Sequence, residues 1–275
     1  MITVELNDKE VCFLLNGDIR GRYVLSDSFK PYFRSLCTPA GHETTLVSPG
    51  DHRHHKGLMF GLRCVDLNFW EENPGEPAGV QRILSTRSLP DGDGIEQELL
   101  WVAENGEMET YREVRQIRAE EEGDAICYQW KTRREALRDH RLIKSKWSLE
   151  LPDGRSINYH GLGIRLPWMW RFPVDAFCGV EKNGVPEDPM AACGATDPSV
   201  GFWGLVDGEW NRPVASVTVR QPPEQAHTWF VLKGDFPYLS VGPSNAEELE
   251  VATGHVFEET YWIEVADRPS DFNKN

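Results

Sequence analysis

The sequence predicts an all-β fold, a large antiparallel β-sandwich with few short helices. Three observations favour it: Asn-Gly and Asp-Gly pairs recur along the chain, strand-like runs flank several of these pairs, and no stretch keeps an extended helical period. Asn and Asp tolerate the left-handed backbone conformation and Gly adopts it freely, which suits the tight turns of hairpins. The dominant local signal is therefore the hairpin.

Individual strands can be placed in chain order. Residues 57–62 are expected to form a buried apolar strand. Two hairpins follow, because residues 98–102 and 110–114 flank Asn105-Gly106, and residues 146–151 and 157–159 flank Asp153-Gly154. Further strands are expected at 125–130, where aromatic and β-branched residues mix, and at 260–265, which alternates with period two.

Length and composition suit one large domain. The chain has 275 residues, of which 40% are hydrophobic and 27% charged, enough for a packed core under a polar surface. No low-complexity linker divides it, so we expect residues 1–275 to form a single β-sandwich domain. The ten tryptophans are explained first by the core of that sandwich, and some of them by a sugar-sized cleft.

The net charge and the cysteine content limit the classes of binding partner and the cellular compartment that we expect. With 44 acidic against 29 basic side chains, the net charge of −15 disfavours nucleic acid and anionic membranes as the main partner. No run of about 20 apolar residues is present, and residues 1–8 lack the features of a signal peptide. The six scattered cysteines are expected to be free thiols, which predicts a cytoplasmic location.

The densest polar cluster is residues 51–57, which read Asp-His-Arg-His-His-Lys-Gly. On an extended segment His52 and His54 would point to one face and His55 to the other. Imidazoles so placed can transfer protons, bind sugar hydroxyls or hold a metal. We expect Asp51 to orient one imidazole and Lys56 to contact the substrate. No cofactor is expected, and a divalent metal on His52 and His54 stays open as the alternative, because its third ligand cannot be chosen from sequence.

Three further residues are candidates. His160 lies in Asn158-Tyr159-His160-Gly161. A histidine here can act as a general acid, because the ordinary pKa of its side chain is near neutrality. The equal alternative is a partly buried histidine with a structural role. Arg34 places a cation in an apolar strand and needs a carboxylate or a ligand. Trp70, beside Glu71, suits stacking on a sugar ring. The sequence has no Walker loop, GxGxxG or GxSxG motif.

Several motifs resemble a bacterial family of soluble proteins that carries the name methane oxygenase PmoA. They are Pro31-Tyr32, the Thr-Pro-Ala-Gly at 38–41, the cluster at 51–58 and the Asn-Phe-Trp at 68–70. The sequence departs from the family pattern at Arg53, where Pro is usual, and at Asn68, where Asp is usual. We do not expect methane oxidation, because the membrane subunit of that name needs several spanning helices.

More weakly, the sequence resembles the galactose-mutarotase type of β-supersandwich. Arg34 and His55 match its sugar-binding positions, and His160 near Asn158 matches its general acid. Residues 229–233 offer no Glu where that family has its base. The resemblance therefore implies carbohydrate binding rather than mutarotation.

Together these observations predict a soluble carbohydrate-active protein. The leading hypothesis is an enzyme of the epimerase, lyase or hydrolase class, in which His55 and His160 exchange protons with a sugar and Arg34 holds an oxygen or carboxylate. The first alternative is a non-catalytic carbohydrate-binding module. The second is a metal-dependent oxygenase or hydrolase built on His52 and His54. The sequence predicts neither the substrate nor the oligomeric state.

Overall fold

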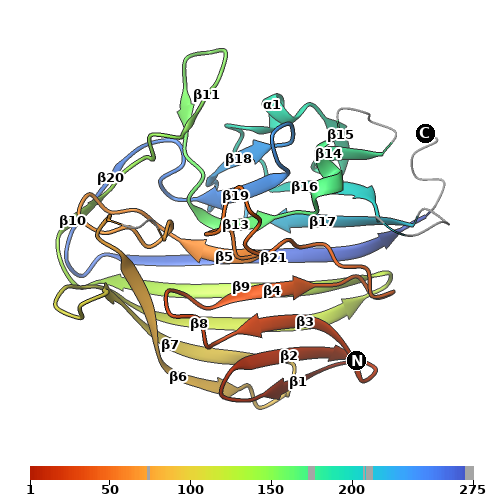
Figure 1. Ribbon diagram of the computed structural model, residues 1–275, viewed down its shortest axis with the longest axis horizontal. Helices are drawn as coiled ribbons and strands as arrows, with labels where there is room; N and C mark the ends of the chain where they lie inside the picture. Colours follow the sequence, from red (N-terminus) through yellow and green to blue (C-terminus); the bar gives the residue numbers. More distant parts are fainter. Residues whose placement is uncertain (73–74, 173–176, 207, 209–212, 270–275) are drawn as a thin grey trace.

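The computed structural model is nearly all β (Figure 1). It describes residues 1–72, 75–172, 177–206, 208 and 213–269. Within these ranges the helical elements are η1 (Trp168–Arg171) and α1 (Pro189–Ala192), each one turn long. Asp188 caps α1, because its side chain accepts hydrogen bonds from the backbone of Met190 and Ala191. The predicted all-β class with few short helices is confirmed.

Two large antiparallel sheets make up the body of the protein. The first has eight strands in the order β1-β2-β3-β4-β5-β13-β19-β18. Its strands are β1 (Ile2–Leu6), β2 (Glu10–Leu15), β3 (Asp18–Val24), β4 (Tyr32–Leu36), β5 (Leu58–Gly61), β13 (Gly161–Arg165), β18 (Thr228–Leu232) and β19 (Tyr238–Gly242).

The second sheet has nine strands in the order β15-β14-β16-β17-β21-β9-β8-β7-β6. They are β6 (Gly79–Ser88), β7 (Gly94–Ala103), β8 (Glu109–Glu122), β9 (Ala125–Ala136), β14 (Cys178–Lys182), β15 (Val185–Glu187), β16 (Ser199–Leu205), β17 (Val214–Arg220) and β21 (Val256–Arg268). Two small pairs join β10 (His140–Leu142) to β20 (Leu249–Val251) and β11 (Leu149–Glu150) to β12 (Ser156–Ile157).

The predicted hairpins can be compared with these strands. Asn105-Gly106 does turn β7 into β8, with Leu100 opposite Arg112. The strand expected at 146–151 is reduced to the two residues of β11, and the chain before it runs as a loop. That loop and the β11–β12 hairpin project from the body of the molecule (Figure 1).

The two sheets face each other across the core. Phe33 of β4 packs against Tyr128 of β9 with ring centroids 5.3 Å apart. The Tyr23 hydroxyl of β3 donates to Gln97 of β7 and accepts a hydrogen bond of 2.8 Å from Arg115 of β8. Aromatic contact and buried hydrogen bonding therefore fix the two sheets against each other.

Unusually for a core, charged side chains lie between the sheets. Glu113 and Arg115 are both fully buried and their ion pair is 2.8 Å long. Arg134 pairs with Glu259 in the same layer, and both are buried. The Arg115 guanidinium lowers the pKa of Glu113 although burial opposes the ionised carboxylate. A buried charge needs such a partner, so each pair is a structural requirement of the core.

Candidate functional site

A cavity of about 600 Å³ opens on the outer face of the eight-stranded sheet. The strand register aligns four residues of neighbouring strands that face the core: Phe60, Leu162, Val241 and Trp229. The residues that alternate with them, such as Tyr238 and Phe230, therefore point outward into the cavity. The cavity is lined by histidine, acidic, aromatic and a few other side chains: Asp51, His52, His54, His55, Glu71, Trp147, Ser148, Leu149, Tyr159, Trp168, Phe230, Leu232, Asp235, Phe236 and Tyr238.

Because Gly163 of β13 has no side chain, two rings pack over this strand: Tyr238, which lines the cavity, and Trp70 beneath it. A Cβ atom added to Gly163 would lie 1.9 Å from the Tyr238 hydroxyl and 2.6 Å from the Trp70 ring. Trp70 is fully buried and is not among the residues that line the cavity. Trp70, which the sequence suggested as a substrate-contacting residue, packs beneath the wall of this cavity.

The histidine cluster is a tight turn and not an extended segment. The backbone N–H of His55 donates to the carbonyl of His52 at 3.0 Å, and the N–H of Ser48 donates to the carbonyl of His55 at 2.7 Å. The rings of His52 and His55 stack with centroids 4.7 Å apart, and His54 meets His55 edge-on at 4.6 Å. The expectation that His55 faces away from the other two was wrong, because the turn gathers all three imidazoles at one cavity.

Asp51 and His52 form a hydrogen-bonded pair at the cavity mouth. One oxygen of Asp51 lies 2.8 Å from Nδ1 of His52 and accepts a hydrogen bond of 3.0 Å from the buried Arg165 guanidinium. Partial burial opposes ionisation of Asp51, but the bonds from His52 and Arg165 bring the pKa of Asp51 below its usual value. An ionised Asp51 fixes the orientation of the His52 ring.

Burial keeps the other two imidazoles neutral. Desolvation, with the charges of Lys30, His52, Lys56 and Arg165 nearby, lowers the pKa of His54 to about 3. Desolvation first, and then the neighbouring histidines, lowers the pKa of His55 well below its usual value. His55 is 3% exposed, and its Nδ1 atom has no hydrogen-bond partner within the described chain. A neutral imidazole of this kind suits hydrogen bonding to a hydroxyl group.

Glu71 and Tyr159 were not predicted as site residues from the sequence. Glu71 lines the cavity although it is only 5% exposed, and the Tyr159 hydroxyl donates a short hydrogen bond to it. Arg63 and Asn68 hold the other oxygen of Glu71 at 3.1 Å and 3.0 Å. The sequence singled out Trp70, the neighbour of Glu71, because a carboxylate acquires its role here only through partners that are distant along the chain.

His160 lies deeper than expected. It is fully buried, its Nδ1 atom is 2.8 Å from the Asn158 amide, and its ring is 5.5 Å from that of Trp70. Burial, and then the charges of Arg63 and His54, lower the pKa of His160 to about 3. His160, which the sequence suggested as a general acid, does not line the cavity.

The two expected binding cations also lie elsewhere. Arg34 is exposed and lines a separate surface hollow with Arg22 and Glu43, because it alternates with the core residue Phe33 along β4. Lys56 forms ion pairs with Asp27 at 3.4 Å and Glu72 at 3.2 Å. Arg34, expected to hold an oxygen of the same sugar as His55, therefore lies outside the cavity, and the Lys56 ammonium is held by two carboxylates.

The described residues contain no group of three or more His, Cys, Asp or Glu side chains arranged to hold a metal ion. All six cysteines are free thiols in the structure. No helix within the described ranges is long and apolar enough to cross a membrane.

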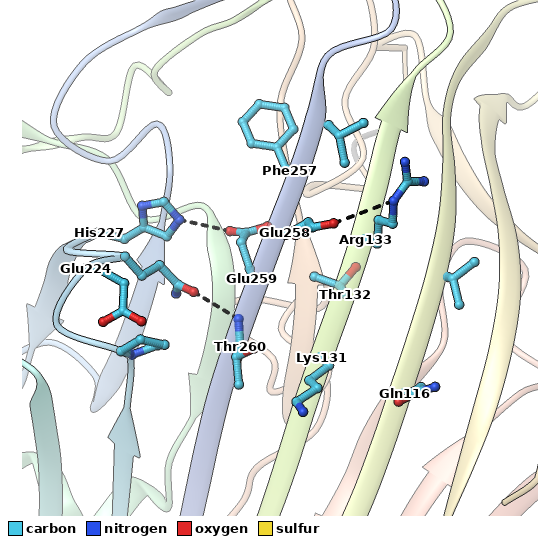
Figure 2. A pocket seen from close by; sticks show the side chains of 14 residues that line it. Gln116, Lys131, Thr132, Arg133, Glu224, His227, Phe257, Glu258, Glu259 and Thr260 are labelled. Carbon is cyan, nitrogen blue, oxygen red and sulfur yellow. Dashed lines mark hydrogen bonds and ion pairs between the residues drawn. The ribbon is translucent and has the colours of Figure 1, made fainter.

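A second hollow, of about 790 Å³, lies against the nine-stranded sheet (Figure 2). Several of its polar groups are already paired with one another. His227 is 3.2 Å from Glu259, Arg133 is 3.7 Å from Glu258, and the Thr260 N–H donates to Gln225 at 2.9 Å. Its one aromatic lining residue is Phe257. Although this hollow is larger, it lacks the group of imidazoles and aromatic rings that lines the cavity with the histidines.

Comparison with known proteins assigns the chain to a family. The profile of the Family of unknown function (DUF6807) matches residues 3–274, and the chain belongs to this family. No curated protein sequence matches it.

Solved structures that match the chain do so at low sequence identity and low structural similarity. A galactose mutarotase related enzyme from Lactobacillus acidophilus is 7% identical, with 98% of each chain covered and a TM-score of 0.39. A putative aldose 1-epimerase from Escherichia coli K12 is 11% identical, with 98% and 99% covered and a TM-score of 0.30. The GH36 alpha-galactosidase AgaB from Geobacillus stearothermophilus is 9% identical over 98% of this chain and 41% of its own, with a TM-score of 0.43.

Proposed function

We propose that the cavity binds a carbohydrate and that the protein is an enzyme that transfers protons to and from it. The observation that carries this proposal is the composition of the cavity wall. Aromatic rings of Trp168, Phe236 and Tyr238 share it with neutral imidazoles and with the carboxylates Asp51 and Glu71. Rings cover the apolar face of a sugar, while imidazole and carboxylate bind its hydroxyl groups.

The roles follow from the hydrogen bonds. Asp51 accepts the Nδ1 proton of His52, which leaves Nε2 of His52 as the ring nitrogen that can accept a proton from a substrate. Glu71, held by Arg63 and Tyr159, is the second group able to exchange a proton at the same cavity. His55 offers its unpartnered Nδ1 to a hydroxyl group. In this proposal His52 takes the proton-transfer role that the sequence suggested for His160.

Sugar binding can be tested by calorimetry with common hexoses, hexuronates and their disaccharides. Replacing His55 with Ala removes one buried hydrogen-bond partner and is expected to weaken binding by about 1–3 kcal/mol, roughly 5- to 150-fold. His255→Ala is the matched control, because His255 is exposed and does not line the cavity. If no sugar in the panel binds, or if His55→Ala leaves the affinity unchanged, the proposal is contradicted.

Catalysis is tested separately from binding. Proton NMR spectra of each bound sugar, followed over time, reveal epimerisation, elimination or hydrolysis. If His52 is the base, His52→Ala lowers the rate by roughly 10²–10⁴ with a small effect on affinity. Sugar binding without any chemical change would instead identify a carbohydrate-binding module. The motif resemblance to the family named after methane oxygenase PmoA, and a cytoplasmic location, stay predictions.

A further inference from the structure

Trp147 is the most exposed aromatic side chain in the described chain. It is 69% exposed and lies on the projecting loop between β10 and β11. It nevertheless lines the same cavity as the 3% exposed His55. The cavity therefore runs from a buried polar end to an open aromatic rim. A volume of about 600 Å³ is within the range of pockets that take ligands larger than one sugar ring.

The loop that carries Trp147 is held in place from inside the cavity. The backbone N–H of Trp147 donates to the Ser145 hydroxyl at 3.2 Å, and the Ser148 hydroxyl donates to the Ser145 carbonyl at 2.7 Å. The Ser145 hydroxyl is in turn 2.7 Å from that of Tyr159, which binds Glu71. A short chain of hydrogen bonds thus links the rim to a proposed proton-transfer group and positions the backbone that carries the indole.

The indole of Trp147 is open to a ligand in a way that the neighbouring Trp168 is not. The cation of Lys146 lies 5.3 Å from the centroid of the Trp147 ring, and no other ring or cation contact to it is recorded within the described chain. Trp168 is contacted by two guanidinium groups, Arg171 at 4.2 Å and Arg165 at 5.2 Å. An exposed indole beside a polar cavity, with Lys146 as its single cation contact among the described residues, suits the C–H face of a pyranose ring.

We infer that Trp147 forms an outer subsite and that the ligand is an oligosaccharide rather than a free monosaccharide. One ring occupies the inner end near His55, and the next ring stacks on Trp147. This inference rests on the proposed function, since it concerns the same cavity, and it adds the size of the ligand.

The experiment compares disaccharides with their component monosaccharides, using glucose, galactose, mannose and glucuronate as the components, by calorimetry. The variants are Trp147→Ala, Trp147→Phe and, as a control, Leu84→Ala, which removes an exposed apolar side chain on β6. In the wild type, a disaccharide should bind more tightly than either component. Trp147→Ala should weaken disaccharide binding roughly 30-fold, the effect of losing one aromatic anchor, and should leave the monosaccharide affinity unchanged. Trp147→Phe should retain most of it.

The outcomes separate the two proposals. If monosaccharides bind through His55 but disaccharides gain nothing from Trp147, the outer subsite is refuted and the proposed function stands. If no sugar binds, or if binding is independent of His55, the proposed function fails and the subsite fails with it. If light scattering shows that Trp147→Ala dissociates a dimer while sugar affinity is unchanged, the exposed indole is a contact between copies of this chain, and the subsite is again refuted.

Discussion

Replacing Gly163 with Ala tests how the floor of the cavity is built. The added methyl group would lie 1.9 Å from the Tyr238 hydroxyl and 2.6 Å from the Trp70 ring, whereas ordinary contacts are 3.4–4 Å. Both rings are at most 1% exposed, so neither can move away without disturbing the core. Overpacking of this kind costs about 1–3 kcal/mol, and two rigid neighbours place Gly163→Ala at the upper end.

The magnitude can be measured by urea and thermal unfolding. A loss of about 3 kcal/mol corresponds to a decrease in melting temperature of roughly 6–12 °C for a chain of this size. Gly234→Ala is the matched control, because nothing lies within 4 Å of its added Cβ and its backbone is not left-handed. It should change stability by less than about 0.5 kcal/mol. Equal stability of Gly163→Ala and Gly234→Ala would refute the packing of Tyr238 and Trp70 over β13.

Three other predictions follow from burial. Burial lowers the pKa of His160 from 6.5 to about 3 in the folded protein. The contribution of the neutral imidazole to stability is therefore complete above pH 6.5 and is lost as pH falls toward 3. In denaturant titrations from pH 6 to 4, His160→Gln should reduce the dependence of the unfolding free energy on pH by about 1.4 kcal/mol per pH unit. Glu113→Gln leaves the Arg115 charge buried and should cost about 3–5 kcal/mol, whereas Glu258→Gln, in an exposed pair, should cost less than about 1 kcal/mol; similar costs would contradict the buried pairing. In a thiol assay six groups should react in denaturant, whereas the native protein should react slowly and first at the half-buried Cys37, whose pKa is raised to about 11 by burial and by Glu43; fast reaction of all six without denaturant would argue against the packing.

The sequence predicted the class of fold because its turns and alternation are local signals. Asn105-Gly106 and the runs beside it carry enough information to form a hairpin without the rest of the chain. The histidine cluster could be singled out for the same reason, since its members are adjacent in sequence. Their arrangement could not, because a turn between β4 and β5 and the positive φ of Gly57 decide which way each ring faces.

The remaining site residues depend on contacts between distant segments. Arg34 was misplaced because a cation beside Phe33 was taken as buried, whereas alternation along β4 points it to solvent. Glu71 and Tyr159 are 88 positions apart and acquire a role only when β13 packs beside β5. Trp147 is distinctive because it is exposed, a property that folding alone reveals.

The most direct test of the central claim is a crystal structure of the protein with the tightest-binding saccharide from the calorimetric panel. The account predicts electron density in the histidine cavity, with a hydroxyl group within hydrogen-bond distance of His55 Nδ1 and a second ring stacked on Trp147. Density for the sugar in the hollow of Figure 2, or on the surface near Arg34, would contradict it.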